Sequence, residues 1–396
     1  MIQKRMAITA PRRVLSIDVL RGITIAFMIL VNDPGDWGHV YAQLDHCPWN
    51  GLTLTDLVFP TFLFLIGVSL IFSLEARRSR GNCRVTLTGH IFRRAAILFA
   101  LDLFLSGFPE YHLGHMRIYG VLTRIALCYL FAGLILLATR RMEALAAVSA
   151  VLLVGYWALM RFVPVPGFGV PTHAMALLDP YRNLAAWIDR GFSEFTLRVL
   201  HTGVLYNQTR DPEGLLSTLP AIATTLIGAM AGLFLRSDRS AVAKRNGLAL
   251  AGVAGIAAGA LWNRSFPINK NLWTSSYVLA AAGCSLLGLA LCYWLMDMER
   301  VQERSRWARA LVWPWLVFGS NAIVVYVMSD LIVDLSYWIK VPDHGRAVTV
   351  WNWIYLHGFS HGRSTELTSV GFALFVVALC FVPNWMLWRR QIFVKI

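Results

Sequence analysis

The sequence predicts an all-α membrane protein, a polytopic helical bundle of about ten transmembrane helices with both termini in the cytoplasm. Of its 396 residues, 57% are hydrophobic and 15% are charged, whereas soluble domains carry about 25% charged residues. Apolar runs of about twenty residues recur along the chain, and each is long enough to cross a bilayer as a helix. The runs are continuous rather than alternating, which favours helices over a β-barrel.

We expect ten spans in chain order. Their approximate ranges are 14–33, 56–75, 90–108, 118–138, 143–162, 215–235, 247–263, 273–296, 310–330 and 367–388. They form one transmembrane domain over residues 1–396, with an outer-side loop region at about 163–214. Within that region we expect an interfacial helix at 181–190.

Basic residues cluster in alternate connections between the spans, which sets the expected orientation. The clusters are Lys4, Arg5, Arg12 and Arg13; Arg77, Arg78, Arg80 and Arg84; Arg140 and Arg141; Arg236, Arg239, Lys244 and Arg245; Arg300, Arg304, Arg306 and Arg309; and Arg389, Arg390 and Lys395. The connection 33–55 has no lysine or arginine. Because basic loops stay in the cytoplasm, we place the clusters there. The net charge of +14 is then explained by topology, and we expect no nucleic-acid partner.

Several chemistries have no support in the sequence. The six cysteines include no CxxC pair, so we expect neither a disulfide framework nor a zinc site. His112-x-x-His115 and His357-x-x-x-His361 have no clear third ligand, and we expect no metal. The chain also lacks a Walker loop, a dinucleotide fingerprint and a nucleophile elbow, which argues against ATP-driven pumping and serine-type hydrolysis.

A polar connection between the first two apolar runs is the first candidate site. It runs from His46 to Pro60 and contains Asn50, followed by Gly51 in a tight turn, and Asp56. Histidine is the side chain best suited to moving protons near neutral pH, so His46 is a candidate acid–base residue. A plain loop histidine is the alternative, and Asp56 is also favoured simply as an acid at a helix N-terminus.

The first span has polar residues at both ends. Asp18 and Arg21 are three residues apart and share a helix face. They form either a structural ion pair or an anchor for an anionic ligand that enters from the cytoplasm. Asn32 ends the span, where its amide either caps the helix or donates a hydrogen bond to a developing oxyanion.

A second pair of basic residues lies around the fourth span. Arg117 and Arg124 are two helical turns apart on one expected face, and Arg124 lies about 10 Å deeper. An arginine inside the membrane is costly and is by default a functional candidate. Pairing with an acid such as Asp102 is the alternative.

Three later segments add polar groups beside apolar runs. Asp211 and Glu213 precede the sixth span, and we expect them to cap its helix. The segment 267–273 is expected to form a re-entrant turn that lines a cavity. Asn321 and Asp330 make the ninth span polar.

Taken in order, these motifs resemble the heparan-α-glucosaminide N-acetyltransferase family of transmembrane acyltransferases. The matching pieces are Ser16-x-Asp18-x-x-Arg21-Gly22, Val31-Asn32, Trp49-Asn50-Gly51-Leu52-Thr53-x-x-Asp56-Leu57-Val58-Phe59-Pro60, Arg117-x-x-Gly120-Val121-Leu122-x-Arg124, Asp211-Pro212-Glu213-Gly214, Pro267-Ile268-Asn269-Lys270-Asn271-Leu272-Trp273 and Gly319-x-Asn321. The resemblance covers almost the whole chain. It implies transfer of an acetyl group from cytoplasmic acetyl-CoA, as co-substrate, to an amino sugar or glycan across the membrane.

The resemblance also assigns roles to residues. It implies that His46 and Asn32 are catalytic. We expect the acceptor to bind Asn50, Asp56, Asp211, Glu213, Asn269, Lys270 and Asn271. We expect acetyl-CoA to bind Asp18, Arg21, Arg117, Arg124 and Asn321.

The chain also departs from the family. It lacks the long amino-terminal luminal portion of the animal enzyme, and its loop 163–214 is shorter, so the identity of the acceptor does not carry over. The compact form is typical of a bacterial inner-membrane protein that contacts membrane lipids, with a homodimer as one assembly left open. An amino-sugar permease is the competing interpretation, although we find no inverted repeat of the kind many transporters have.

Overall fold

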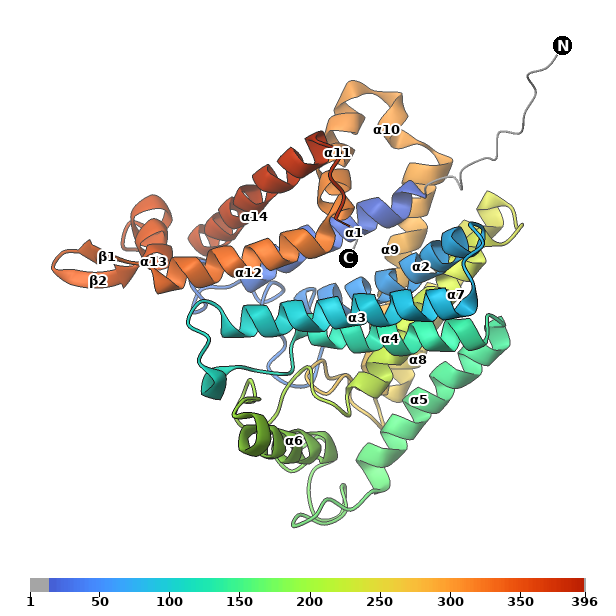
Figure 1. The fold of residues 1–396 in the computed structure, drawn as a ribbon, viewed down its shortest axis with the longest axis horizontal. Coiled ribbons are helices and arrows are strands. Elements are labelled where there is room, and N and C mark those ends of the chain that lie inside the picture. The colour runs from blue at the N-terminus through green and yellow to red at the C-terminus, as the bar shows by residue number, and fades with distance from the viewer. Residues whose placement is uncertain (1–13, 395–396) are drawn as a thin grey trace.

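The computed structural model describes residues 14–394 and shows a helical bundle (Figure 1). The main helices are α1 (Leu15–Asn32), α2 (Val58–Arg78), α3 (Arg84–Gly107), α4 (Val121–Ala138), α5 (Met142–Phe162), α6 (Leu184–Leu200), α7 (Thr218–Arg236), α8 (Ala241–Trp262), α9 (Ser275–Cys292), α11 (Arg306–Ser320), α12 (Ala322–Trp338) and α14 (Glu366–Arg389). Shorter elements are η1 (Thr55–Leu57), η2 (Leu113–His115), η3 (Tyr293–Met298), α10 (Val301–Arg304), β1 (Lys340–Asp343), β2 (Arg346–Thr349), α13 (Val350–Tyr355) and η4 (Leu356–Ser360). The basic residues Lys4, Arg5, Arg12, Arg13 and Lys395, which we expect in the cytoplasm, lie outside the described residues.

The all-α membrane class is confirmed, whereas the count of ten spans is not. Among the described residues, seven helices are long and apolar enough to cross a membrane, or up to eight if one bent pair counts as a single span. Helices α3 and α8 occupy two of the predicted ranges but are not among them. In α3 the reason is charge, because every 18-residue stretch contains Arg93, Arg94 and a third charged side chain.

The predicted span at 310–330 is not one unbroken helix. Helices α11 and α12 meet at an angle of 82°, and Asn321 is the residue between them. At this break the side-chain amide of Asn321 is hydrogen-bonded to the backbone of residues 392 and 394. Two glycines allow α11 to cross α1 closely there, since a Cβ on Gly319 would lie 2.0 Å from the Asp18 carbonyl oxygen and one on Gly22 would lie 1.8 Å from that of Trp315.

The start of α4 also differs from the prediction. Helix α4 begins at Val121, so Arg117 lies in the preceding irregular segment and is not two helical turns from Arg124 on one face. The cause is Asp102, whose carboxylate accepts hydrogen bonds from the backbone N–H groups of Leu122 at 3.2 Å and Thr123 at 3.1 Å. It satisfies N–H groups in the first turn of the helix and fixes its start.

Two further elements depart from the expected outline. The interfacial helix expected at 181–190 is α6, which begins at Leu184 and continues to Leu200. Its N-cap is Asn183, whose side chain accepts a hydrogen bond from the N–H of Ala186. The chain is also not purely helical, because β1 and β2 form a short antiparallel hairpin.

One end of the bundle, which we call the Arg77 end, gathers the connections 79–83, 139–141, 237–240 and 299–305 and the segment 390–394. Helix ends next to these parts contact one another, through Arg140 with Glu75 of α2, Arg236 of α7 over the ring of Phe72, and the N–H of Leu15 of α1 with Asp297. The end is named for Arg77, in the last turn of α2. It collects most of the basic clusters that the sequence places in the cytoplasm.

The other end, which we call the His46 end, gathers the connections 33–54, 108–120, 163–217, 263–274 and 339–365. Contacts between them are Trp49 with Leu178, Asn50 with Asn269, and Arg117 with Asp211, and Trp338 at the end of α12 contacts Glu110. The helices therefore run between two ends that each join connections distant in the sequence.

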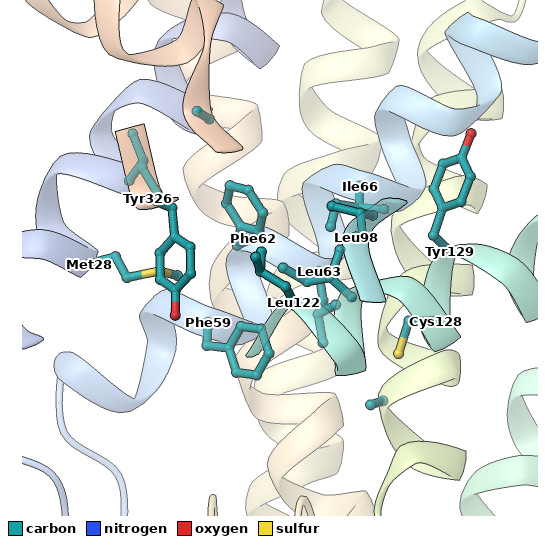
Figure 2. Packing of buried hydrophobic residues seen from close by; sticks show 14 of the residues in the cluster. Met28, Phe59, Phe62, Leu63, Ile66, Leu98, Leu122, Cys128, Tyr129 and Tyr326 are labelled. Carbon is teal, nitrogen blue, oxygen red and sulfur yellow. The ribbon is translucent and has the colours of Figure 1, made fainter. Parts of the chain in front are cut away.

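The core between the two ends is built from tightly packed apolar side chains. Figure 2 shows part of it, where Met28 of α1, Phe62 of α2 and Leu122 of α4 lie close to Tyr326 of α12. Small residues bring helix backbones together elsewhere, since a Cβ on Gly228 of α7 would lie 1.9 Å from the carbonyl oxygen of Phe64 on α2. Close approach through small residues is typical of helix packing in lipid.

Candidate active site

His46 and Asp56 form a hydrogen-bonded pair at the His46 end. Nδ1 of His46 lies 2.8 Å from Oδ1 of Asp56. Asp56 is fully buried, whereas the His46 side chain is 38% exposed. A carboxylate can only accept, so in this contact Nδ1 carries a proton, and in the neutral ring the lone pair is on Nε2. The arrangement leaves Nε2 as the basic atom of the ring.

The Asp56 carboxylate is held in place by the loop that precedes it. Its Oδ2 accepts hydrogen bonds from the backbone N–H groups of Cys47 at 3.2 Å and Thr53 at 3.0 Å. The hydroxyl of Tyr277 on α9 donates to the Asp56 carbonyl oxygen at 2.6 Å. With its lone pairs occupied, the carboxylate fixes both the orientation and the tautomer of His46.

The loop around His46 is attached to the connection between α8 and α9. The N–H of Gly51 donates to the Ile268 carbonyl oxygen at 2.9 Å, and Nδ2 of Asn269 donates to Oδ1 of Asn50 at 3.1 Å. Gly51 has φ +136°, a left-handed backbone conformation that favours glycine. The predicted turn at Asn50-Gly51 is thus where the two loops join.

Lys270 reaches His46 from the same connection. Its Nζ lies 3.2 Å from Nε2 and 3.4 Å from Nδ1 of the imidazole ring. Burial lowers the pKa of Lys270, while the carboxylates of Glu213 and Asp56 oppose that shift. Lys270, His46 and Asp56 therefore form one electrostatic unit, although 224 residues separate Lys270 from His46.

Arg117, Asp211 and Glu213 form an ion-pair network at this end. Nη2 of Arg117 lies 2.8 and 3.0 Å from the two Asp211 oxygens and 3.3 Å from Glu213. Burial and the neighbouring Glu213 raise the pKa of Asp211, and Arg117 opposes the rise. The prediction that these acids cap the next helix is wrong, because α7 has no side-chain cap and Asp211 instead accepts from Arg117 and from the N–H of Tyr206.

A neighbouring carboxylate, Asp189 on α6, contacts the segment that precedes α7. It is buried and accepts a hydrogen bond from the N–H of Leu215 at 3.0 Å. A Cβ on Gly214 would lie 2.1 Å from Asp189 Oδ2, so only glycine fits there. Burial raises the pKa of Asp189 to about 7.

Arg124 is fully buried in the first turn of α4. Its Nη2 donates to the Gly214 carbonyl oxygen at 2.9 Å and to the Ser217 hydroxyl at 2.5 Å, and its guanidinium lies 5.1 Å from the centre of the Trp273 ring. Within the described residues, Nε and Nη1 have no hydrogen-bond partner. Unpaired buried donors are rare and invite a ligand that accepts hydrogen bonds.

A cavity of about 490 Å³ opens at the Arg77 end. Its polar lining includes Asp18, Arg21, Ser69, Arg77, His90, Arg93, Arg94 and Asn321. Arg21 joins three helices there, with Nη2 2.8 Å from the Ser69 hydroxyl and Nη1 3.2 Å from the Gly319 carbonyl oxygen. The predicted pair of Asp18 and Arg21 is present, at 3.4 Å. Four arginines face one acid, which makes the cavity suited to an anion.

The cavity extends along α2 toward His46. Its lining follows one face of that helix from Arg77 to Phe62, and a gap of about 10 Å³ beyond Phe62 is lined by Met28, Leu122 and Tyr326 among others. Phe62 is six residues after Asp56, about 9 Å along a helix axis. Met28, Phe62, Leu122 and Tyr326, which line this gap, are labelled in Figure 2.

The structure divides the predicted site residues into two groups. His46, Asn50, Asp56, Arg117, Arg124, Asp211, Glu213, Asn269 and Lys270 belong to the His46 end, and Asp18, Arg21 and Asn321 line the cavity. Arg117 and Arg124 are thus separate from the residues with which the sequence grouped them. Asn32 is exposed at the end of α1, and Asn271 is half-buried next to Lys270.

Several cavity residues were missed from sequence. Arg93, Arg94 and His90 lie in the predicted third span, and a histidine with two arginines inside an apolar run was a usable signal. Ser69 and Tyr129 carry no such signal. Within the described residues, no group of three or more histidine, cysteine, aspartate or glutamate side chains could hold a metal ion.

The fold and the two sites together define a helical membrane protein with a histidine–aspartate pair at one end and a basic cavity at the other. Comparison with known proteins then identifies the family to which the chain belongs. The model of the family described as "Heparan-alpha-glucosaminide N-acetyltransferase, catalytic" matches residues 13–262, and the chain belongs to this family.

Two curated relatives extend the comparison. The chain is 28% identical over 437 residues to heparan-alpha-glucosaminide N-acetyltransferase of Homo sapiens, a match that covers 98% of this chain and 60% of that protein. It is 28% identical over 373 residues to the protein of the same name in Mus musculus, with coverage of 82% and 54%. The chain thus spans a little over half the length of the relatives it matches.

Proposed function

We propose that this protein is a transmembrane acetyltransferase that uses cytoplasmic acetyl-CoA to acetylate an acceptor on the opposite side of the membrane. The acceptor is an amino sugar or a glycan that carries one. The Arg77 end faces the cytoplasm, and the His46 end faces the periplasm of a bacterial inner membrane. The observation that carries the proposal is the His46–Asp56 pair, 2.8 Å apart, at the opposite end from a basic cavity.

The basic cavity is suited to the nucleotide part of acetyl-CoA. Coenzyme A carries several phosphate charges, and arginine is the preferred side chain for binding phosphate through paired hydrogen bonds. Arg77, Arg93 and Arg94 all line the cavity. Arg21 contributes charge but is engaged by Asp18, Ser69 and Gly319, so we assign it mainly to shaping the cavity.

The pantetheine arm of the acetyl donor would bridge the distance between the ends. The hydrocarbon core is about 30 Å thick, yet the cavity already reaches Phe62, about 9 Å along α2 from Asp56. Outward rotation of the Phe62 ring would join the cavity to the small gap next to Leu122. The thioester would then meet His46 without leaving the bundle.

The chemistry follows from the free lone pair on Nε2. His46 accepts a proton from the acceptor amine as the amine nitrogen bonds to the thioester carbonyl carbon. The carbon–sulfur bond then breaks, and the imidazolium returns the proton to the departing thiolate. Asp56 stabilises the imidazolium between the two steps. The Asn32 amide and the unpaired N–H groups of Arg124 are the candidates to stabilise the tetrahedral oxyanion.

Acetyl transfer can be tested on purified protein with radiolabelled acetyl-CoA and glucosamine as the acceptor probe. We expect labelled N-acetylglucosamine with wild type and none with His46→Ala, which should still bind acetyl-CoA. Failure of the wild type to bind acetyl-CoA would contradict the proposal. Uptake of glucosamine into vesicles without acetyl-CoA would instead favour a permease.

Direct transfer and a covalent acetyl-histidine are distinguished by omitting the acceptor. We propose direct transfer, because the half-exposed His46 can contact both substrates at once. Label should then be absent from denatured wild-type protein. Label that is retained on wild type, absent from His46→Ala and released onto added glucosamine would establish the covalent route.

A further inference from the structure

The segment that follows α14 turns back into the bundle. Gln391 has φ +56°, its N–H donates to the Trp388 carbonyl oxygen, and the N–H of Ile392 donates to that of Leu387 at 2.9 Å. This is the Schellman pattern, in which a left-handed residue ends a helix and reverses the chain. In Figure 1 the chain beyond α14 returns toward α1 and the start of α12.

Asn321 fixes the returning segment with both ends of its amide. Its Nδ2 donates to the Ile392 carbonyl oxygen at 3.1 Å, and its Oδ1 accepts from the Val394 N–H at 2.9 Å. Asn321 is almost fully buried and lies at the break between α11 and α12. The Asn321 side chain thus supplies one donor and one acceptor to the backbone of this segment, as a neighbouring β-strand would.

The result is that Phe393 becomes part of the cavity wall. Phe393 and Val394 line the cavity together with Arg77 and Arg93. Of the other three aromatic rings that line it, Phe62 lies at the far end, the Tyr129 ring is covered by the Arg94 guanidinium 4.6 Å from its centre, and the His90 imidazole is a smaller and more polar ring. Phe393 is half-buried and is therefore the six-membered ring that a ligand can contact beside the arginines.

We propose that Phe393 binds the adenine base of acetyl-CoA and that Asn321 is a positioning residue that holds Phe393 in place. The inference rests on the proposed function, because it assigns a subsite within that cavity. Bases bind to aromatic rings by stacking regardless of sequence, and a phosphate-binding arginine group next to an aromatic ring matches the two parts of a nucleotide. Asn321, which the sequence assigned to direct binding of the acetyl donor, acts through the segment it holds.

The test compares two acetyl donors that differ only in the nucleotide. Acetyl-CoA contains the adenosine part, and S-acetyl-4′-phosphopantetheine does not. We expect Phe393→Ala to weaken acetyl-CoA binding about tenfold, as loss of one stacked base would, and to leave binding of S-acetyl-4′-phosphopantetheine unchanged. Phe393→Trp should retain acetyl-CoA binding. Ile392→Ala, which removes an exposed side chain but keeps the carbonyl that Asn321 contacts, is the matched control.

Asn321 is tested through its coupling to Phe393. Asn321→Ala should weaken acetyl-CoA binding by the same factor as Phe393→Ala, and the double variant should be no weaker than either single one. Unchanged binding of S-acetyl-4′-phosphopantetheine by the same samples shows that the variants are folded.

Three outcomes would overturn the subsite. Equal affinity of Phe393→Ala and wild type for acetyl-CoA would remove Phe393 from it, and tighter binding would show that Phe393 blocks the cavity. Additive effects in the double variant would give Asn321 a separate role. If the wild type bound neither acetyl donor, the proposed function itself would fail, and this result is distinct from the other three.

Discussion

The Lys270 ammonium group lies almost equally far from the two ring nitrogens of His46, at 3.2 Å from Nε2 and 3.4 Å from Nδ1. A nitrogen on the lone-pair axis of Nε2 would be much farther from Nδ1. Lys270 therefore lies against the face of the imidazole ring, as cations do with aromatic rings. The Nε2 lone pair remains open to a substrate.

Replacing Lys270 with methionine should lower the transfer rate without lowering stability. The change keeps the length of the side chain but removes a cation that lies beside His46 and carries a burial cost. We expect at least a tenfold lower kcat, unchanged acetyl-CoA binding, and a Tm no lower than that of wild type. Wild-type kcat in Lys270→Met would show that the ammonium group has no part in the reaction.

Asp56→Asn should abolish most of the activity, because an amide cannot hold the His46 tautomer and also accept from the N–H groups of Cys47 and Thr53. Changing the matching aspartate of a catalytic triad lowers kcat by about 10⁴. The variant should also lose stability, so activity is measured per folded molecule by size-exclusion chromatography and binding of acetyl-CoA. A loss smaller than tenfold would separate Asp56 from the chemistry.

Arg124→Lys should lower kcat at least tenfold while leaving acetyl-CoA affinity unchanged. Lysine keeps the charge but cannot retain the contacts with Gly214 and Ser217 and also supply the two unpaired N–H groups. The measurement is a separate determination of kcat and of the acetyl-CoA dissociation constant. A weakened dissociation constant with normal kcat would return Arg124 to the donor-binding role that the sequence suggested.

The pKa of Asp189 near 7 predicts how stability depends on pH. Its ordinary value is 3.8, so between about pH 4 and about pH 7 the folded protein holds a proton there that the unfolded chain releases. This contribution to stability falls as pH rises through that window. Asp189→Asn keeps an acceptor for the Leu215 N–H but cannot titrate. The Tm of the variant relative to wild type should therefore increase from about pH 5 to about pH 8, and a difference independent of pH would contradict the assignment.

The proposed orientation predicts the location of reporters fused to the chain. Reporters placed after Arg78, Arg141, Arg239 and Arg306 should all be cytoplasmic, and one placed after His173 should be periplasmic. The test is informative because 163–217 also contains arginines, and long loops cross the membrane largely regardless of charge. A periplasmic signal at any two of the four basic sites would reject the orientation.

Hydropathy predicted the helices well because a membrane helix must satisfy its own backbone within one apolar segment. It failed at Asn321, where apolar residues continue on both sides and the break depends on hydrogen bonds to residues 392 and 394. It also misplaced the start of α4, which is set by Asp102 from a different helix. Features that depend on a distant partner leave no periodic pattern in the local sequence.

The sequence predicted which residues belong to the candidate site better than it predicted which of them contact one another. His46, Asp56 and Lys270 were each identified, but nothing in their spacing indicates that the three meet. Arg117 and Arg124 were grouped with the acetyl donor because an arginine inside the membrane is suited to binding an anionic donor. Phe393 was not identified, because a single aromatic residue near the end of an apolar helix matches the interfacial pattern seen throughout membrane proteins.

The junction between the His46 loop and the α8–α9 connection has a consequence for biosynthesis. Asp56, the Asn50 amide and the Gly51 turn emerge early, whereas their partners Tyr277, Asn269 and Ile268 emerge more than 200 residues later. At translation rates of about 5–20 residues per second, the interval for the 224 residues between His46 and Lys270 is roughly 10 to 45 seconds. A ribosome-bound chain in that interval has His46 but neither Lys270 nor the partners that hold its loop. Under the proposed function, we expect no acetyl transfer until at least about two thirds of the chain has been made.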